Sequence, residues 1–306
     1  MSDSPGKPRA RRKRRQKMPL ALKLIRSAFR LVSPIAPGLA SRQAYRLWFR
    51  TQRHPLPARE RPALANACCK NIDLDGKRIA TYSWGEIGPW VLLVHGWSGR
   101  GTQMAPFVEP LLKAGYRILS FDAPGHGKSA GNGTSAIEII DTMTLLEEQY
   151  GPFHAIITHS FGGLCVAAAL NDKLNSERAV FIAPPASLLG LLEMFAEFLQ
   201  LSEKAQTKMQ TLALQQFGQD LWQRMDTREN VRTLSIPGLI IHDEDDHDVP
   251  WQQGLEIAEA WPKARFIKTH RLGHGRILSD VSIIKATIEF LTAKDGKIQL
   301  REKKLA

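Results

Sequence analysis

From about residue 70 onward, short apolar segments alternate with segments of helical pattern, and this alternation limits the chain to few folds. Strands that alternate with helices usually form a mostly parallel sheet with helices on both faces. The pattern therefore predicts the α/β class. Six segments are expected to be buried strands: Val91–Val94, Arg117–Phe121, Ala155–Thr158, Ala179–Ala183, Leu239–His242 and Arg265–Thr269. Helical segments are expected near residues 102–115, 134–150, 161–173, 252–262 and 280–293.

Two regions depart from the simple alternation. Ahead of the first buried strand, Asn71–Leu74 and Arg78–Trp84 flank Asp75-Gly76, a dipeptide typical of a tight hairpin turn. Residues 186–233 form a long helical insertion rich in Leu, Met and Phe. Its apolar residues either line a pocket for an acyl chain or pack helix against helix: Leu188, Leu189, Leu191, Leu192, Met194, Phe195 and Phe198.

The net charge of +12 is concentrated at the N-terminus, since residues 1–59 carry +15 and residues 60–306 carry −3. Residues 1–17 contain almost nothing apolar, so we expect a disordered basic tail. The rest of the chain is expected to divide into an N-terminal helical segment with a linker, residues 18–62, and a domain over residues 63–306.

Within the N-terminal segment, residues 18–33 show the spacing of an amphipathic helix whose polar face is Lys23, Arg26 and Arg30. Pro34 and Pro37 are expected to end it, and a second helix is expected over Ser41–Thr51. A basic tail followed by such a helix suggests attachment of residues 7–33 to an anionic membrane surface. Alternatively, the helix docks on the protein body, and the tail is a solvated arm or a weak nucleic-acid contact, although the acidic body makes nucleic acid the less favoured partner.

The cysteine content and the hydropathy pattern indicate the compartment. Cys68, Cys69 and Cys165 are too few for a disulfide framework, which is typical of a reducing environment. The apolar stretch after the basic tail is interrupted by charges, unlike a signal peptide, and no run approaches the roughly 18 residues that span a bilayer. We expect a cytoplasmic protein that can attach peripherally to the inner face of the membrane.

Ser160 is the candidate nucleophile. It lies in Thr158-His159-Ser160-Phe161-Gly162-Gly163, between an apolar strand and a helical segment. A serine on such a strand-to-helix turn exposes its hydroxyl above the sheet, and Gly162 suits the strained backbone there. Thr158 is larger than the glycine usual at its position. The motif alone also fits an ordinary turn serine, so its context decides between the two.

The segment His95-Gly96-Trp97-Ser98-Gly99, directly after a buried strand, supplies part of that context. Acyl transfer develops a negative oxygen that preorganised backbone N–H groups stabilise. Trp97 and Phe161 are the candidate oxyanion donors, with His95 and Gly96 supporting the loop. The alternative is a glycine-rich turn without a catalytic role.

The candidate acid and base follow the serine along the chain. Asp246 lies after the strand Leu239–His242, at the sheet edge where α/β folds place their sites. His274 lies between glycines after the strand Arg265–Thr269, and the order Ser, Asp, His is used by serine hydrolases of this class. His270 is the rival base. The carboxylates near Asp246 could instead form a solvated loop or a metal site with His242 or His247, but their spacing fits no calcium or zinc motif.

No cofactor is expected. Gly127-Lys128-Ser129 is similar to the end of a phosphate-binding loop, but Asp122 stands where that motif requires glycine.

These segments together are similar to the α/β-hydrolase superfamily over about residues 70–295. The resemblance rests on His95-Gly96-Trp97, Asp122 to Ser129, Ser160-Phe161-Gly162-Gly163, Asp246 to Pro250 and Gly273-His274, in that order. It implies an eight-stranded sheet, a helical lid between the sixth and seventh strands at residues 186–233, and a triad of Ser160, Asp246 and His274. Epoxide hydrolases and dehalogenases of the superfamily have aspartate at the elbow, which Ser160 argues against.

The expected activity is hydrolysis of a carboxylic ester or thioester of a small molecule through a covalent acyl-enzyme. Acyltransfer and C–C bond hydrolysis use the same triad, so both stay open. A binding protein that kept the fold without catalysis is the alternative from another class. The presence of all the catalytic elements favours the enzyme.

Overall fold

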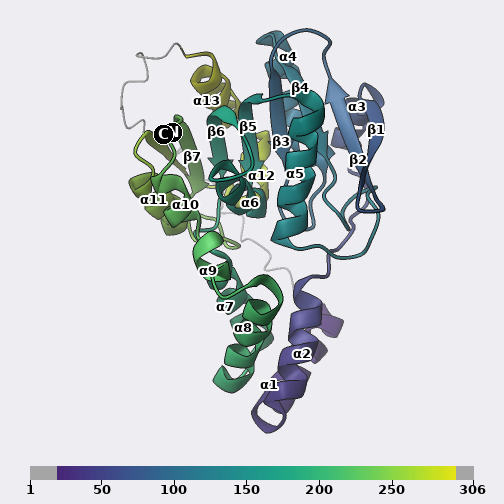
Figure 1. Ribbon diagram of the computed structural model, residues 1–306, viewed down its shortest axis with the longest axis vertical. Helices are drawn as coiled ribbons and strands as arrows, with labels where there is room; N and C mark the ends of the chain where they lie inside the picture. Colours follow the sequence, from purple (N-terminus) through teal and green to yellow (C-terminus); the bar gives the residue numbers. More distant parts are fainter. Residues whose placement is uncertain (1–18, 294–306) are drawn as a thin grey trace, which may run out of the picture.

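Eight strands form one central sheet in the order β1-β2-β4-β3-β5-β6-β7-β8 (Figure 1). The computed structural model describes residues 19–293, so the expected disorder of residues 1–17 lies outside the described residues. The strands are β1 (Cys68–Leu74), β2 (Lys77–Trp84), β3 (Trp90–Val94), β4 (Arg117–Phe121), β5 (Phe153–His159), β6 (Ser176–Ile182), β7 (Gly238–Asp243) and β8 (Ala264–Thr269).

Pairing in the sheet is parallel from β4 to β8 and antiparallel at the β1 edge. β1 pairs with β2 and β2 with β4 in antiparallel register, whereas every later pair is parallel. The six predicted buried strands all form, with ends shifted by at most three residues. The predicted hairpin closes at Asp75 and Gly76, which both adopt positive φ. The mostly parallel α/β sheet is therefore confirmed.

Helices cover both faces of this sheet. Those of the main body are α3 (Arg61–Ala65), α4 (Val108–Lys113), α5 (Ala136–Tyr150), α6 (Phe161–Leu170), α11 (Trp251–Ala260), α12 (Gly273–Arg276) and α13 (Val281–Thr292), with 3-10 turns η1 (Ala58–Glu60), η2 (Gly101–Phe107) and η3 (Ile277–Ser279). The helix expected near residues 102–115 is divided into η2 and α4, because Pro106 lacks the N–H that a continuous helix would use.

The two faces of the strands form two separate cores. In β3, Leu92 and Val94 pack with α5 and α6, while Val91 and Leu93 pack with η2, α4 and α13. Side chains alternate between the faces of a strand, so a strand covered on both sides must be apolar throughout. This explains why the buried strands appear in the sequence as continuous apolar runs.

Between β6 and β7 the chain forms four helices, which we call the cap: α7 (Leu188–Leu199), α8 (Glu203–Phe217), α9 (Leu221–Arg224) and α10 (Thr227–Arg232). The N-terminal helices α1 (Leu20–Ile35) and α2 (Pro37–Trp48) lie beside α7 and α8, and this group projects away from the sheet (Figure 1).

The first helix does not end before Pro34 as expected. Pro34 lies in the last turn of α1, and Pro37 begins α2, where a backbone N–H would have no helical acceptor in any case. A small core made by Phe29, Ala40, Ala44 and four cap residues joins α1 and α2 to the cap. Ser202 adds two hydrogen bonds to Ser33: its N–H donates to the Ser33 hydroxyl at 2.9 Å, and its hydroxyl donates to the Ser33 carbonyl at 2.8 Å. Within residues 19–293, no helix combines the length and the apolar character that crossing a membrane requires.

Candidate active site

Ser160 occupies a sharp turn between β5 and α6. Its backbone has φ 52° and ψ −125°, a strained conformation for a residue other than glycine. A Cβ at Gly162 would lie 2.8 Å from the His95 carbonyl oxygen, and a Cβ at Gly96 would lie 2.9 Å from the Ser160 Cβ. These two glycines therefore let the serine turn and the loop after β3 approach each other closely.

Thr158 replaces the glycine usual at the start of the elbow, and Gly163 compensates for its size. Thr158 is fully buried, and a Cβ at Gly163 would lie only 3.1 Å from its hydroxyl oxygen. That hydroxyl has no hydrogen-bond partner among the described residues. The larger side chain is accommodated because the facing helix has no side chain at this point.

Two buried histidines hold the loop after β3. The His95 Nε2 accepts a hydrogen bond from the Ala123 N–H at 3.0 Å, while its Nδ1 donates to the Gly96 carbonyl at 2.7 Å. The His126 Nε2 accepts from the Ser98 N–H at 2.9 Å. The loop that carries Trp97 is therefore fixed on both sides, by a residue of its own and by the loop after β4.

These acceptor roles require neutral rings. Burial lowers the pKa of His95, and burial together with the neighbouring His95 lowers the pKa of His126 to about 3. A protonated ring nitrogen cannot accept a hydrogen bond, so both contacts persist through the neutral pH range.

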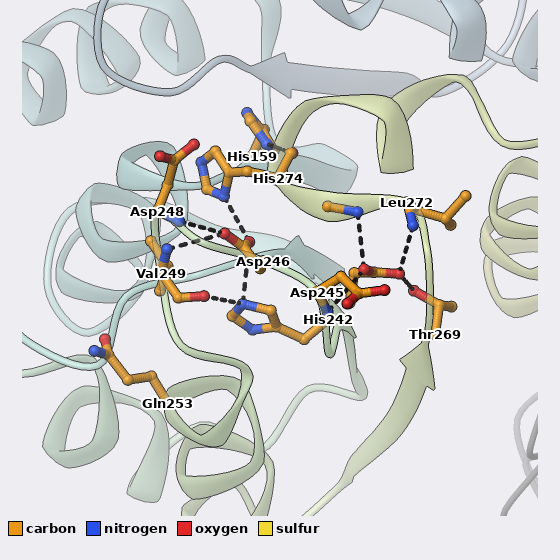
Figure 2. Close-up of polar contacts among 12 residues, drawn as sticks. His159, His242, Asp245, Asp246, Asp248, Val249, Gln253, Thr269, Leu272 and His274 are labelled. Atoms are coloured by element: carbon orange, nitrogen blue, oxygen red, sulfur yellow. Dashed lines mark hydrogen bonds and ion pairs between the residues drawn. The ribbon is translucent and has the colours of Figure 1, made fainter. Parts of the chain in front are cut away.

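His274 and Asp246 are brought into direct contact (Figure 2). The His274 Nδ1 lies 2.7 Å from the Asp246 Oδ2, so Nδ1 carries the proton and donates it to the carboxylate. The other oxygen, Oδ1, accepts from the N–H groups of Asp248 and Val249 at 2.9 and 3.0 Å. This arrangement leaves the His274 Nε2 as a proton acceptor.

A second histidine, His242, contacts the same carboxylate from the buried side. The His242 Nε2 lies 3.0 Å from the Val249 carbonyl oxygen and 3.4 Å from the Asp246 Oδ2 (Figure 2). Burial alone would raise the pKa of Asp246, but hydrogen bonds from His242, His274 and Val249 outweigh it and hold that pKa well below its usual range. Asp246 is therefore ionised at neutral pH.

Ser160 and His274 line one pocket, together with Gly96, Trp97, His159 and Asp248. The rival base His270 does not line it. Within the described residues, no hydrogen bond joins the Ser160 hydroxyl to His274. Such catalytic contacts often tighten only when substrate binds.

His159, the residue before Ser160, contacts the candidate base His274 through the backbone. Its Nε2 donates to the His274 carbonyl oxygen at 2.8 Å, and the two rings lie 4.7 Å apart between centroids. Burial and the nearby His274 lower the pKa of His159 to about 3, so its ring is neutral. The elbow and the loop of the base are thereby linked.

Ligand atoms of Asp246, Asp248 and His274 lie within 4.8 Å of one another. His247, a candidate in the metal alternative, is exposed and does not belong to this group. In the present arrangement His274 and Asp246 use their facing atoms to contact each other, so an ion there would have to displace that hydrogen bond. The residues fit an acid–base pair better than a metal site.

Asp243, which the sequence analysis does not predict as a site residue, accepts hydrogen bonds that hold the loop carrying His274. Its Oδ1 accepts from the Gly273 N–H at 2.8 Å, and its Oδ2 accepts from the Thr269 hydroxyl at 2.7 Å and the Leu272 N–H at 3.1 Å. Burial opposes ionisation, but these hydrogen bonds outweigh it and lower the pKa of Asp243. Asp243 lies at the carboxyl end of β7, close to Asp246, where α/β folds place their functional residues; this position is the sequence feature that could have identified it.

The segment after α2 contributes to the site as well, which the sequence did not indicate. The Gln52 N–H donates to the Ser98 hydroxyl at 3.0 Å, and the Thr51 hydroxyl donates to the Gly125 carbonyl at 2.7 Å. His54 lines the pocket of Ser160. The segment from Thr51 to His54 thus passes across the loops after β3 and β4 and forms one wall of the candidate site.

A second, apolar pocket adjoins the first and shares Trp97 with it. Its cavity volume is about 30 Å³, so its walls lie close together. Its walls come from the end of α2, the cap and the catalytic loops, and include Tyr45, Trp48, Phe49, Trp97, Phe161, Leu188, Leu192, Ala213, Phe217 and Met225. Of the seven insertion residues considered as pocket residues, Leu188 and Leu192 line this pocket.

Comparison with known proteins gives similarities of different extent. The chain is 25% identical over 199 residues to the lysophosphatidylserine lipase ABHD12 of Danio rerio, covering 60% of this chain and 50% of that protein. It thus spans about half the length of this relative. It is 23% identical over 238 residues to the pimeloyl-[acyl-carrier protein] methyl ester esterase of Klebsiella pneumoniae (strain 342), covering 64% of this chain and 91% of that protein.

Among solved structures, the bromoperoxidase from Bacillus anthracis superimposes with a TM-score of 0.56 at 21% identity, over 74% of this chain and 99% of that one. This likeness concerns the fold. The family model described as "Alpha/beta hydrolase family" matches residues 91–281, which contain the serine turn, the acid and the histidine loop. The chain therefore belongs to the alpha/beta hydrolase family.

Proposed function

We propose that this chain is a serine hydrolase that cleaves a carboxylic ester or thioester of a small molecule, with Ser160 as nucleophile, His274 as base and Asp246 as orienting acid. The observation that carries the proposal is the 2.7 Å contact between His274 and Asp246 at the pocket that Ser160 also lines. An ionised aspartate fixes the ring so that its free nitrogen can accept a proton.

In the proposed reaction, the His274 Nε2 takes the proton of the Ser160 hydroxyl while the Ser160 Oγ attacks the substrate carbonyl carbon. The imidazolium is stabilised by Asp246. Collapse of the tetrahedral intermediate breaks the bond to the alcohol or thiol, which leaves with the proton from His274. Water then gives a proton to His274 as its oxygen attacks the acyl carbon. Collapse of this second tetrahedral intermediate breaks the bond to the Ser160 Oγ, which takes the proton back from His274, and releases the acid.

Backbone N–H groups of Trp97 and Phe161 are the proposed oxyanion donors. Within the described residues, neither N–H donates to an acceptor of the chain, so both can serve a ligand. Preorganised donors of this kind contribute about 3 kcal/mol each to the transition state. The neutral His95 and His126 keep the Trp97 loop in place for this task.

The apolar pocket supports an acyl group as the part of the substrate that it holds. Aromatic and aliphatic side chains surround it, and Trp97 and Phe161, which carry the proposed oxyanion donors, lie in its wall. The names of the two curated relatives, a lipase and a methyl ester esterase, both describe cleavage of esters. None of the proposed steps uses a metal ion or a cofactor.

A fluorophosphonate probe tests the nucleophile. It should label the wild-type chain at Ser160, because a serine activated by a base attacks the phosphorus, and Ser160→Ala should abolish labelling. Mass spectrometry of the labelled peptide locates the adduct. A folded wild-type chain that stays unlabelled would refute the proposal.

His274→Ala should reduce kcat by several orders of magnitude with an unchanged melting temperature, because the base is lost while a half-buried side chain leaves the core intact. His270→Ala, a histidine only four residues away and outside the pocket, is the matched control and should retain most activity. Steady-state kinetics on an activated ester measure both variants. Equal losses would show that the base is assigned wrongly.

Asp243→Asn should lower kcat/KM by about 100-fold, the effect of a small displacement of a catalytic group. The amide can no longer accept from the Thr269, Leu272 and Gly273 donors together, so the loop of His274 shifts. The rate of fluorophosphonate labelling should fall in parallel. Glu244→Gln, at an exposed neighbouring position, is the control. Wild-type kinetics in Asp243→Asn would show that Asp243 does not position the His274 loop.

Ala213→Leu should shift the preference toward esters with shorter acyl chains. Ala213 is buried on α8 in the pocket wall, so a larger side chain fills space that the acyl chain would occupy. Gln215→Leu, an exposed position on the same helix, should leave the preference unchanged. A series of esters of increasing chain length measures the effect. An unchanged order of kcat/KM in Ala213→Leu would place the acyl group elsewhere.

A further inference from the structure

Helix α1 turns most of its apolar side chains away from the protein. Phe29 and Ser33 are its buried residues, and they face the small core shared with the cap. Leu20, Leu24, Leu31 and Ile35 instead expose 72, 62, 64 and 86% of their surface. At 3.6 residues per turn, these four positions fall within about 60° of one another around the helix.

We call Leu20, Leu24, Leu31 and Ile35 the outer apolar face. It extends along the whole helix, a distance of about 24 Å. Leu39, just beyond the turn into α2, is exposed as well. Scattered exposed leucines are ordinary, but a continuous apolar row on a helix marks an interaction surface. The sequence also allows the alternative that this helix buries its apolar face on the protein body. In the structure only Phe29 and Ser33 are buried in this way.

The charges on α1 and α2 themselves are of one sign. No acidic residue occurs from residue 20 to residue 57, whereas Lys23, Arg30, Arg42 and Arg46 are exposed on α1 and α2. Residues 7–17, directly ahead of α1 in the sequence, contain eight Lys and Arg. An apolar row bordered by basic residues complements an anionic lipid surface: acyl chains take up the leucines while phosphate groups pair with the cations.

We propose that the outer apolar face inserts into the interfacial layer of an anionic membrane, with α1 parallel to the membrane surface. A protein partner is less well matched, because interface centres are depleted of charge and usually include aromatic anchors, whereas this face is purely aliphatic and bordered by cations. The docking itself rests on α1 and its charges and is independent of catalysis.

Docking would bring the membrane close to the apolar pocket. Helix α2, which pairs with α1, carries Tyr45 and Trp48 near its end and is followed by Phe49, and these three residues form part of the pocket wall. An ester with a long acyl chain could then pass from the bilayer to Ser160 without crossing water. This consequence rests on the proposed hydrolase function, and it specifies the substrate class as membrane-borne amphiphilic esters.

Flotation of the full chain with vesicles tests the docking. The Ser160→Ala chain is used so that binding is read without turnover. It should float with vesicles of phosphatidylcholine mixed with phosphatidylserine at low salt, bind them less at high salt, and remain unbound with phosphatidylcholine alone. Failure to bind the anionic vesicles at low salt overturns the docking, whatever the outcome of the activity tests.

Paired variants separate insertion from simple charge attraction. Leu24→Gln/Leu31→Gln should lower the fraction bound at least tenfold, because it removes apolar side chains that the fold leaves exposed. Ile87→Gln/Val281→Gln changes exposed apolar side chains elsewhere and should bind as the parent chain does. Equal binding by the first pair and the parent would show that the basic tail alone holds the vesicles. A change from dimer to monomer in that pair, without vesicle binding by the parent, would identify a second copy as the partner. Either result overturns the proposal.

Discussion

The close approach of helix α6 to the carboxyl end of β3 is the constraint on which the rest of the site depends. A Cβ at Gly162 would lie 2.8 Å from the His95 carbonyl oxygen, so only glycine lets the two elements meet. The strained backbone of Ser160 costs roughly 1–3 kcal/mol. It is offset by hydrogen bonds that fix the turn, from the Ser160 N–H to the Ile182 carbonyl and from the Gly163 N–H to the Ser160 carbonyl, both 2.8 Å long. The serine and both proposed oxyanion donors follow from this one packing contact.

Around this contact, three histidines are held neutral by burial, whereas the fourth, His274, faces a carboxylate. His95, His126 and His159 are buried away from any carboxylate hydrogen bond and are held neutral, so they can act as fixed donors and acceptors. His274 contacts an ionised aspartate and lines a solvent-accessible pocket. A base must gain and lose a proton during turnover, whereas supporting residues must not. Full burial of three rings, and the half-buried setting of His274 against Asp246, separate the supporting histidines from the proposed base.

The sequence predicts the strands, the elbow and the Asp246–His274 pair because each has a local signal. Buried strands appear as apolar runs, and the elbow requires a glycine at a fixed distance from the serine. Asp243 shares its signal, the carboxyl end of β7, with its neighbours: residues 243–248 include five carboxylates, and only the tertiary fold shows which one is buried against three donors of the histidine loop.

Contacts between residues far apart in the chain likewise cannot be predicted from the sequence. Thr158 departs from the expected glycine, and its fit depends on Gly163, which lies across the turn rather than next to it in the strand. The contacts of Thr51 and Gln52 with Gly125 and Ser98 join residues that are 74 and 46 positions apart. Periodicity describes which face of an element is buried but not what covers it. For this reason the sequence does not show that the N-terminal segment forms one wall of the candidate site and joins it to helix α1.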